Sequence, residues 1–374
     1  MRQVAQVETA RHDWPVDDLG PALVAFVRPC DGLEAIVVID NVAQGPAIGG
    51  VRWRPEVTAG EIARLARAMT IKNALAGLPH GGAKAGIASA TLAGDDHERV
   101  MRAFACAIDQ LTNYIPGPDM GTTETSMAYV RDEIGRAVGL PSLLGGIPLD
   151  ELGATGFGLA VCADVLAEAG LIELGGARVI IQGMGAVGWH AAHFLAGRGA
   201  TVIAVSDIQG ATWNPAGLDV AALGEYKRSV GSVSHFPGGT AIPRDDILTF
   251  DCDLLIPAAQ PDVVTADNAA KISARVIIEG ANIPLTAQAE AQLAKRGVLC
   301  VPDVVANAGG VICAAAEYRG AGRVEAFAEI EEKIRDTTAE LLDRTRRGSL
   351  TPRAAAVLMA RERLAAAMAL RRKF

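Results

Sequence analysis

The sequence predicts an α/β protein with two domains, the second of which is built on a doubly wound parallel sheet. Short apolar runs alternate with helical stretches between about residues 178 and 301, and this alternation is typical of such a sheet. A Gly- and Pro-rich stretch, LPSLLGGIPLDELGATG, precedes the alternation and indicates a domain crossing. At 374 residues the chain is long enough for two domains and a sizeable core.

The N-terminal part is predicted to contain two strands followed by helices. Residues 34–40 (EAIVVID) and the run AIGGVRW have the composition of strands. Helical periodicity extends from Thr58 to Leu75, with Thr58 as the N-cap and Glu61 placed to complete a capping box. A second amphipathic helix is predicted over residues 95–112, and the polar loop PGPDMGTTETSM leads into a third.

The remaining elements follow the alternation of the second domain. Apolar strands are predicted at residues 178–182, 200–206, 253–256, 275–278 and 298–301. Helices are predicted at residues 158–169 and 189–197, and two long helices begin near Val324 and after Thr351–Pro352. We therefore expect a first domain over residues 1–145 and a second over 146–334, with the helices of residues 335–374 packing back on the first.

The composition excludes several kinds of function. A net charge of -8 and a pI of about 5.4 argue against nucleic-acid or anionic-membrane partners. The N-terminal segment lacks the apolar run of a signal peptide, and no stretch approaches a transmembrane span. The six cysteines show no CxxC and no paired spacing with histidine, which predicts buried thiols without a zinc site or disulfides. We expect a cytoplasmic protein that holds no metal.

A glycine motif follows the first strand of the second domain. It consists of Gly183, Met184, Gly185, Ala186, Val187 and Gly188. Because this GxGxxG lies between a strand and a helix, it predicts a Rossmann-type turn that receives a pyrophosphate at the helix N-terminus, although a purely structural turn has the same pattern. Asp207, at the end of the next strand, is placed to bind the ribose hydroxyls, and residues 208–212 contain no cation for a 2′-phosphate. These features favour NAD over NADP.

Two lysines mark the segment from Thr70 to Ile87, TIKNALAGLPHGGAKAGI. Lys72 falls on a predicted helix, whereas Lys84 falls in a predicted glycine-rich turn with little side-chain bulk around it. Burial in such a turn would lower the pKa of Lys84 and make it useful in acid–base chemistry. Taken alone, the GGxK pattern also fits a surface turn with a solvated lysine.

Four blocks occur in a fixed order along the chain: GPAIGGVRW (45–53), TIKNALAGLPHGGAKAGI (70–87), PGPDMGTTETSM (116–127) and VVANAGGVI (304–312). With the Rossmann turn between the third and fourth, they resemble the Glu/Leu/Phe/Val amino acid dehydrogenase family from about residue 30 to the C-terminal helices. The resemblance implies an N-terminal α/β substrate domain and an NAD-binding Rossmann domain. It also implies reversible oxidative deamination of an L-amino acid to a 2-oxo acid and ammonium, by a homo-oligomer that is a hexamer or an octamer.

The resemblance assigns the central roles to three residues. Lys72 matches the lysine that holds the substrate α-carboxylate, Lys84 the catalytic lysine, and Asp119 the aspartate that relays protons at the amino group. These roles agree with the chemistry, because a low-pKa lysine paired with a carboxylate can deprotonate the attacking water. The alternative role of Asp119 is that of a turn-capping residue before Gly121.

Other positions complete the site that the resemblance implies. Thr155 matches a threonine beside the nicotinamide, Asn282 a contact to the nicotinamide ribose, and Asn307 a contact to the substrate amino group. Gly49 and Gly50 of the first block belong to the substrate site. The glycine-rich segment departs from the family pattern at Ala85, which replaces a glycine next to the lysine.

The expected substrate side chain is apolar, branched-chain or aromatic. Glutamate-specific members of the family place a lysine just before the GG of the first block and a serine in the helix after NAGG. Here those positions are Ile48 and Ala314, and a γ-carboxylate buried against them would lack a partner. Arg52 or Arg54, which lie nearby in the sequence, is the alternative source of a cation.

Two other functions stay open. The block PGPDMGTTETSM is closer to glutamate-type members, so a glutamate dehydrogenase or a dehydrogenase of a less common amino acid is one alternative. A non-catalytic NAD-binding regulatory homologue is the other, and the presence of Lys72, Lys84 and Asp119 argues against it.

Overall fold

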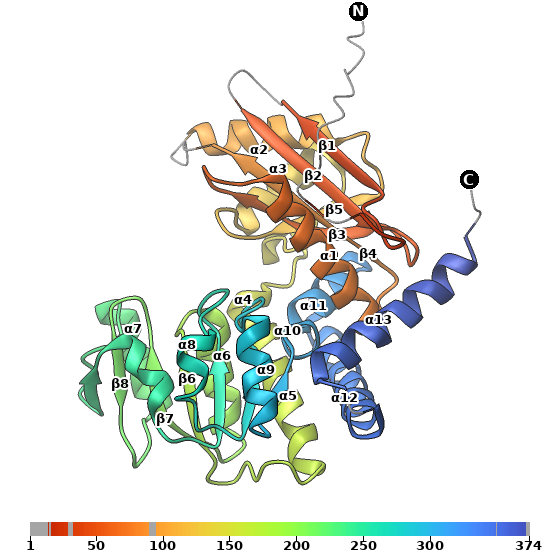
Figure 1. The fold of residues 1–374 in the computed structure, drawn as a ribbon. Helices are drawn as coiled ribbons and strands as arrows, with labels where there is room; N and C mark the ends of the chain where they lie inside the picture. The colour runs from red at the N-terminus through yellow and green to blue at the C-terminus, as the bar shows by residue number, and fades with distance from the viewer. Residues whose placement is uncertain (1–13, 15, 29–32, 90–94, 349, 372–374) are drawn as a thin grey trace, which may run out of the picture. The chain divides into compact units, whose positions relative to one another are not determined.

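The computed structural model describes residue 14 and residues 16–28, 33–89, 95–348 and 350–371. The chain divides into two compact units. The first contains residues 1–70 and 79–138, and the second contains residues 71–78 and 139–374. The main boundary therefore falls at Gly139, immediately before the Gly- and Pro-rich stretch. Figure 1 shows the order of the elements along the chain.

The first unit is built on a five-stranded mixed sheet. Its strands are β1 (Leu23–Val27), β2 (Glu34–Asn41), β3 (Ala47–Trp53), β4 (Gly81–Ala88) and β5 (Tyr114–Pro118), in the spatial order β1-β2-β4-β3-β5. Strand β2 runs antiparallel to β1 and β4, whereas β3 runs parallel to β4 and β5. The sequence predicted β2 and β3. It placed the whole of PGPDMGTTETSM in a loop, whereas the first three residues of this block form the end of β5.

The glycine-rich segment around Lys84 is the central strand β4, so its prediction as a turn was wrong. The strand needs glycine at these positions because neighbouring backbone atoms leave no room for a Cβ atom, and not because the chain bends there. A Cβ atom at Gly81 would lie 1.8 Å from Asn41 O, and one at Gly82 would lie 2.0 Å from Thr70 N. Ala85 is fully buried and alternates with Lys84 along the strand, so the two side chains point to opposite faces of the sheet. The extra methyl group of Ala85 therefore lies in the core and not beside the lysine.

Three helices belong to this part of the chain, namely α1 (Ala59–Leu75), α2 (Asp95–Ile108) and α3 (Glu124–Ile134). Thr58 caps α1 as predicted, because its Oγ1 accepts from the Glu61 backbone N–H at 3.2 Å. The Glu61 carboxylate, however, binds two arginines described below, so the predicted capping box is not its role. The end of α1, from residue 71, groups with the second unit.

The second unit contains a seven-stranded sheet. Its strands are β6 (Arg178–Gln182), β7 (Thr201–Ser206), β8 (Ala211–Trp213), β9 (Thr240–Ile242), β10 (Leu254–Pro257), β11 (Val276–Ile278) and β12 (Leu299–Val301). The order is β12-β11-β10-β6-β7-β8-β9, and the first five strands are parallel. The predicted parallel sheet is confirmed, but β8 and β9 extend it in the antiparallel sense.

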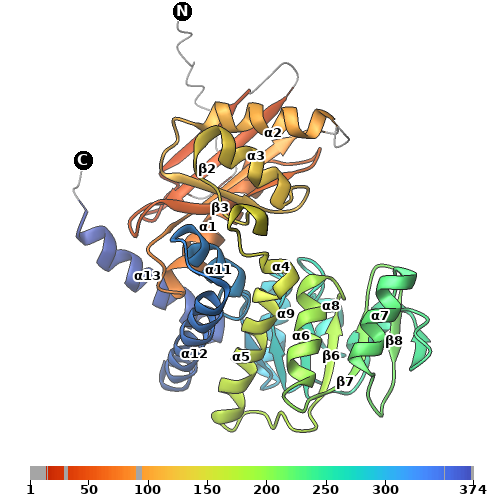
Figure 2. The ribbon, with the colours of Figure 1, turned by 180° about the vertical axis from the view of Figure 1, so that it is seen from behind.

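The helices of the second unit are α4 (Leu149–Leu152), α5 (Ala154–Glu168), α6 (Ala186–Ala196), α7 (Val220–Val230), α8 (Ala266–Ala269), α9 (Ala287–Lys295), α10 (Asp303–Ala306), α11 (Gly309–Tyr318), α12 (Arg323–Gly348) and α13 (Pro352–Ala369), with 3₁₀ turns at Ser142–Leu144 and Arg244–Thr249. Helices α5 and α6 lie side by side on one face of the sheet (Figures 1 and 2). The other face is packed by α8 and α9.

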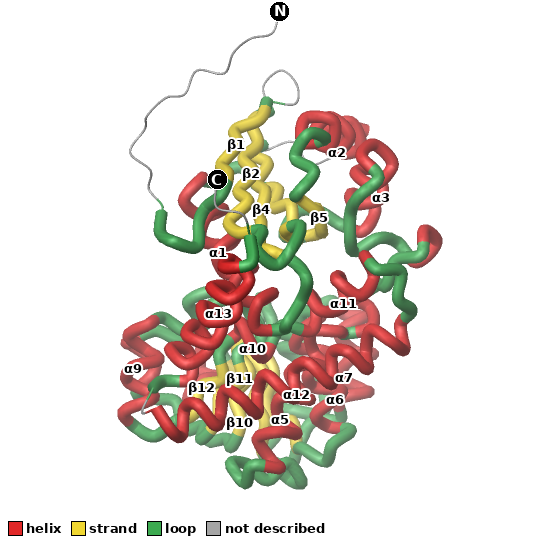
Figure 3. The backbone as a smooth tube through the Cα atoms, turned by 90° about the vertical axis from the view of Figure 1, so that its right-hand side faces the viewer, coloured by secondary structure: helices red, strands yellow, loops and turns green. Residues whose placement is uncertain are grey.

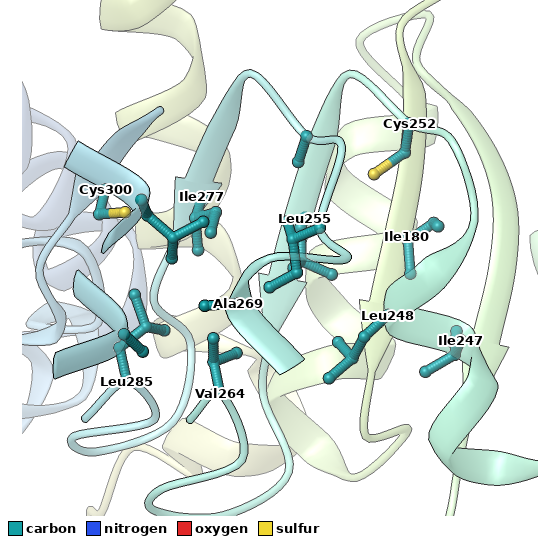
Figure 4. Close-up of a cluster of buried hydrophobic side chains, with 14 of the residues drawn as sticks. Ile180, Ile247, Leu248, Cys252, Leu255, Val264, Ala269, Ile277, Leu285 and Cys300 are labelled. Carbon is teal, nitrogen blue, oxygen red and sulfur yellow. The ribbon is translucent and has the colours of Figure 1, made fainter. Parts of the chain in front are cut away.

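The core under α8 and α9 is a row of side chains from adjacent parallel strands. Ile180, Leu255, Ile277 and Cys300 are paired across β6, β10, β11 and β12, and all are buried (Figure 4). Because paired residues of a sheet point to the same face, the four form a continuous apolar layer. Cys300 therefore fills the core, as expected for a thiol without a partner.

The cysteines are buried with one exception among the described residues. Cys162, Cys252, Cys300 and Cys313 are buried, whereas Cys106 is exposed on α2. The prediction that all are buried was therefore wrong for Cys106, whose Sγ lies 3.5 Å from a Glu133 carboxylate oxygen on α3. Cys30 lies outside the described residues.

Two long helices, α12 and α13, end the chain (Figure 3). Both bind the end of α1 within the second unit. Thr337 Oγ1 donates to Leu75 O at 2.9 Å, and the Arg363 guanidinium donates to Ala74 O and Leu75 O. These contacts hold the turn of α1 that carries Lys72. No helix within the described ranges has both the length and the hydropathy of a membrane span.

Candidate active site

The GxGxxG turn connects β6 to the N-terminus of α6, as the motif predicts. Gly183 has a φ of +99°, which favours glycine, and a Cβ atom there would lie 2.6 Å from Ala259 Cα. A Cβ atom at Gly188 would lie 1.9 Å from Gly183 O, whereas one at Gly185 would meet nothing within 4 Å. Helix α6 begins at Ala186, and Gly185 provides no side-chain cap. Gly185 and Ala186 are exposed, so the N-terminus of α6 can present backbone N–H groups to an anion such as a pyrophosphate.

Asp207 follows β7, and its carboxylate is held by hydrogen bonds from neighbouring residues of the second unit. Its carboxylate accepts hydrogen bonds from the backbone N–H of Gln209 at 2.9 Å and of Val233 at 2.7 Å, and from Ser232 Oγ at 3.1 Å. Lys227 Nζ on α7 lies 3.6 Å from its Oδ2. Burial opposes ionisation, but these donors and Lys227 outweigh it, so the pKa of Asp207 lies below its usual range.

Lys227 and Ser232 were missed by the sequence analysis. Residues 208–212, directly after the strand, contain no cation. In the structure the positive charge near Asp207 is that of Lys227 on α7, which lies twenty residues further along the chain. No motif in the sequence marks this pairing, because it depends on how α7 packs near the end of β7.

Lys84 and Asp119 form a buried ion pair in the first unit. Lys84 lies on β4 and Asp119 directly follows β5, with Nζ 3.1 Å from Asp119 Oδ1. A Cβ atom at Gly50, on the strand between them, would lie 3.2 Å from Lys84 Nζ and 2.8 Å from Asp119 Cβ. A glycine at position 50 therefore leaves room for the pair. Burial is the main reason that the pKa of Lys84 is lowered, against the opposing charge of Asp119.

Arg52 and Glu61 extend this pair into a network that the sequence analysis did not predict. Arg52 Nε donates to Asp119 Oδ2 at 2.7 Å, and its Nη1 donates to Glu61 Oε1 at 2.7 Å. Arg54 also donates to Glu61, at 2.6 and 2.7 Å. Burial alone would raise the pKa of Asp119, but Lys84 and Arg52 outweigh it and hold the pKa below its usual range. Asp119 is therefore ionised, beside the Arg52 guanidinium and the Lys84 amine.

The sequence around Arg52 carried no signal of this network. Arg52 and Arg54 were considered only as alternative cations for a substrate carboxylate. In the structure both arginines instead donate hydrogen bonds to Glu61, and Arg52 also donates one to Asp119. An arginine that binds two carboxylates at once has its fork of donors occupied, so it is poorly suited to bind a third.

Lys72, Asn282 and Asn307 come together in the second unit. Lys72 Nζ donates to Asn282 Oδ1 at 3.0 Å, and Asn307 Nδ2 donates to the same oxygen at 3.2 Å. Asn307 is 7% exposed, and its Oδ1 is one of the buried acceptors in the described part of the chain that receives no hydrogen bond. Such an acceptor is costly to leave unpaired and suits a ligand that donates an N–H group.

Thr155 lies beside the NAGG segment. A Cβ atom at Gly310 would lie 3.0 Å from Thr155 Oγ1, and one at Gly309 would lie 2.1 Å from Ala154 O. The two glycines therefore let the start of α11 approach the start of α5. Ala314, further along α11, is 7% exposed. Thr155 and Ala314 were predicted as site residues from the family resemblance, and both belong to the second unit.

Ile48 shares a sheet face with Lys84. It lies two residues before Gly50 on β3 and pairs with Gly82, two residues before Lys84 on β4. Because side chains alternate along a strand, Ile48 and Lys84 point to the same side. Ile48 is 3% exposed. Ile48 therefore places an apolar, uncharged side chain on the face of the sheet that carries Lys84.

The predicted site residues fall into two groups. Lys84, Asp119, Ile48 and the two glycines before Val51 belong to the first unit, whereas Lys72, Thr155, Asn282, Asn307, Ala314 and the nucleotide turn belong to the second. Within the described ranges, no group of three or more His, Cys, Asp or Glu side chains is arranged to hold a metal ion.

Family models match almost the whole chain. Residues 145–372 match the model of the glutamate/leucine/phenylalanine/valine dehydrogenases, and residues 26–136 match the dimerisation domain of the same family. The glutamate dehydrogenase of Aeropyrum pernix is 39% identical over 356 residues, which cover 88% of this chain and 85% of the relative. An NADP-specific glutamate dehydrogenase of Saccharolobus shibatae is 41% identical over 295 residues, or 74% of this chain and 69% of the relative.

Solved structures show the same fold. A hetero-hexameric glutamate dehydrogenase from Thermus thermophilus, in a leucine-bound form, is 30% identical with a TM-score of 0.86, covering 95% of this chain and 91% of the other. An L-tryptophan dehydrogenase from Nostoc punctiforme is 26% identical with a TM-score of 0.73, covering 94% and 97%. The two-domain architecture, the dinucleotide turn and these matches agree. The chain belongs to the glutamate/leucine/phenylalanine/valine dehydrogenase family, whose members are amino acid dehydrogenases acting on the CH–NH₂ group.

Proposed function

We propose that this enzyme catalyses the NAD-dependent, reversible oxidative deamination of an L-amino acid with an apolar side chain, branched-chain or aromatic, to the 2-oxo acid and ammonium. The observation that carries the proposal is the buried Lys84–Asp119 pair, with its 3.1 Å contact, next to Gly50 and Ile48. A lysine with a lowered pKa gives up its proton more readily than a free lysine and can act as a base, and the adjacent carboxylate can pass protons.

Each proposed role follows from the chemistry of the residue. Lys72 binds the substrate α-carboxylate as a point charge, and Asn307 Oδ1 accepts a hydrogen bond from the amino group. Bound NAD supplies the hydride acceptor. After hydride transfer, neutral Lys84 takes a proton from the water that attacks the substrate iminium carbon, and Asp119 exchanges protons with the departing nitrogen.

The apolar preference rests on Ile48. A γ-carboxylate beside Ile48 would lose its hydration without gaining a cation from that position, and such desolvation costs several kcal/mol, on the order of 2–7 for a polar group. Arg52 and Arg54, the alternative cations, are bound to Glu61. The arrangement therefore supports discrimination against glutamate.

Glutamate is the second candidate substrate. The observation that favours it is that the relatives from Aeropyrum pernix, Saccharolobus shibatae and Thermotoga maritima are all named glutamate dehydrogenases, at 39–41% identity. The L-tryptophan dehydrogenase of Nostoc punctiforme, at 26% identity, supports the aromatic alternative.

A reductive-amination screen separates these candidates. Purified enzyme is assayed with NADH, ammonium and a panel of 2-oxo acids that includes those of glutamate, leucine, valine, phenylalanine and tryptophan. We expect kcat/KM for an apolar 2-oxo acid to exceed that for 2-oxoglutarate by about 100-fold or more, since that ratio corresponds to roughly 2.7 kcal/mol. Faster turnover of 2-oxoglutarate would establish the glutamate candidate, and absence of turnover with every acid, despite NADH binding, would establish a regulatory homologue.

A double substitution tests the residues behind this preference. Ile48→Lys combined with Ala314→Ser is expected to raise the ratio of 2-oxoglutarate to apolar activity by about 10-fold or more, because it supplies a cation and a hydroxyl to the γ-carboxylate. Ile48→Met is the matched control, since it changes shape without adding charge. An unchanged ratio in the double variant would show that neither position contacts the substrate side chain.

NAD is the proposed cofactor because Asp207 is ionised and would repel a 2′-phosphate. Asp207→Ser is expected to raise the NADP-to-NAD ratio of kcat/KM by about 10-fold or more, since it leaves Lys227 without its anion. Adding Lys227→Met to Asp207→Ser should remove that gain. A preference that stays the same in Asp207→Ser would mean that this carboxylate does not select the cofactor.

The assembly proposed is a homo-oligomer, a hexamer or an octamer, and the proposed location is the cytoplasm. A structural neighbour from Thermus thermophilus is described as hetero-hexameric, which supports six subunits. The match to the family's dimerisation domain also supports association of like chains. Light scattering coupled to size exclusion measures the mass directly.

A further inference from the structure

The second unit contains a buried cluster of charges around Arg353. Arg353, in the first turn of α13, binds three carboxylates at once. Its Nη2 donates to both oxygens of Glu279 at 2.8 and 2.7 Å, its Nε to Glu290 at 2.7 Å, and its Nη1 to Asp303 at 3.0 Å. Glu279, Glu290 and Asp303 are 0%, 6% and 1% exposed. No sequence motif and no step of the proposed mechanism uses this cluster.

The three carboxylates come from segments at one end of the parallel sheet. Glu279 directly follows β11, Asp303 begins α10 just after β12, and Glu290 lies on α9. Ligands of open α/β sheets bind outside the carboxyl ends of the strands, where these first two segments lie. Arg353 therefore connects the C-terminal helix to the segments that carry Asn282 and Asn307.

The connection runs through Asp303 to Asn282 and Asn307. Asp303 Oδ1 binds Arg353, while its Oδ2 accepts from the backbone N–H of Ile283 at 3.1 Å. Ile283 has a φ of +49°, a conformation that a β-branched residue adopts only where its surroundings enforce it. It directly follows Asn282, whose Oδ1 accepts from Lys72 Nζ and from Asn307 Nδ2.

The charges of the cluster explain why an arginine is needed. One guanidinium faces three carboxylates, so the cluster keeps an excess of negative charge in a buried place. Burial is the main reason that the pKa of Glu279 is raised, to about 8, against the opposing charge of Arg353. Without Arg353, the remaining carboxylates would repel each other, and Asp303 would no longer be held toward the Ile283 N–H.

We propose that Arg353 is a positioning residue of this enzyme, which fixes Asn282 and Asn307 for the nicotinamide half of the cofactor and the substrate amino group. The inference rests on the proposed function of those two asparagines. A planar fork can bind the carboxylates of Glu279, Glu290 and Asp303 simultaneously, whereas a lysine presents a single point charge. The residue acts through Asp303 and does not itself touch the reacting atoms.

Arg353→Lys is the informative substitution because it keeps the charge and removes the fork. We expect kcat/KM for the preferred amino acid to fall by about 10–100-fold, as misplacement of a site by a distant residue can do. The Kd for NADH should rise by about 10-fold or more, while the Kd for ADP, which lacks both the nicotinamide and its ribose, should stay within about 2-fold. Arg353→Met should show the same pattern more strongly if it folds.

The readouts separate positioning from stability. Equal weakening of NADH and ADP binding in Arg353→Lys would show a general disturbance of the nucleotide-binding unit and overturn the proposal. Arg344→Met is the control, because Arg344 on α12 pairs with Glu340 and Glu362 and should leave every constant unchanged. Wild-type kinetics in Arg353→Lys would also overturn it.

Asn307→Ala and Asn282→Ala distinguish this inference from the proposed function. If both alanine variants weaken amino acid turnover while Arg353→Lys behaves like the wild type, the positioning role fails and the roles of the asparagines stand. If neither alanine variant has any effect, the proposed roles of Asn282 and Asn307 fail, and the positioning role fails with them.

Discussion

Replacing Lys84 with alanine is expected to reduce kcat by about 10³-fold or more while leaving NADH binding unchanged. General bases contribute on the order of 10²–10⁴-fold, and Lys84 is the buried amine with a lowered pKa beside Asp119. The nucleotide turn belongs to the other unit, so loss of this amine should not change the Kd for NADH. Steady-state kinetics and NADH fluorescence titration on the same preparation give the two values.

The fold should survive this substitution. Asp119 keeps Arg52 as a partner at 2.7 Å, so no buried carboxylate is left without a cation. Lys295→Ala, at the end of α9, is the matched control for loss of a lysine elsewhere and should keep full activity. Retained turnover in Lys84→Ala would remove this residue from the mechanism, whereas loss of NADH binding would point to a wider structural change.

Asp119→Asn is expected to lower kcat by about 10²–10³-fold, again with unchanged NADH binding. Asparagine keeps the shape but cannot exchange a proton with the substrate nitrogen. The charge of Asp119 raises the pKa of Lys84, so its removal should lower that pKa further. The rise of kcat/KM with pH that reports neutral Lys84 should therefore move to lower pH in the residual activity.

The sign of this pH shift tests the coupling directly. Asp132→Asn is the control, because Asp132 is an exposed partner of Arg102 and should leave both the rate and the pH profile as they are. A shift to higher pH in Asp119→Asn would contradict the ion pair. Wild-type activity in this variant would mean that another group relays the proton.

The parallel sheet of the second unit was predictable because its signals are local. The prediction for residues 178–182 matches β6 residue for residue, and the strands β7, β10, β11 and β12 lie within one residue of their predicted bounds. Continuous apolar runs of this kind are required where both faces of a strand are covered by helices. Strands β8 and β9, of three residues each, are too short to produce such a run.

The strand around Lys84 shows where local reasoning failed. Clustered glycines predict a turn when the sequence is considered alone. In β4 they are needed because Asn41 O and Thr70 N approach within about 2 Å of where a Cβ atom would stand, which is a property of the packed sheet. The same packing turns Ala85 away from Lys84, which a one-dimensional pattern does not show.

The sequence by itself determined the two-domain α/β plan, the dinucleotide turn at Gly183–Gly188 and, through the family resemblance, the importance of Lys72 and Lys84. Only the tertiary structure decided which charges surround them. Arg52 meets Asp119 across 67 residues, and Arg353 meets Glu279 across 74. Periodicity and motifs report on neighbours in the chain, whereas ion pairs form between side chains that folding brings together, and these pairs control the pKa of each buried group.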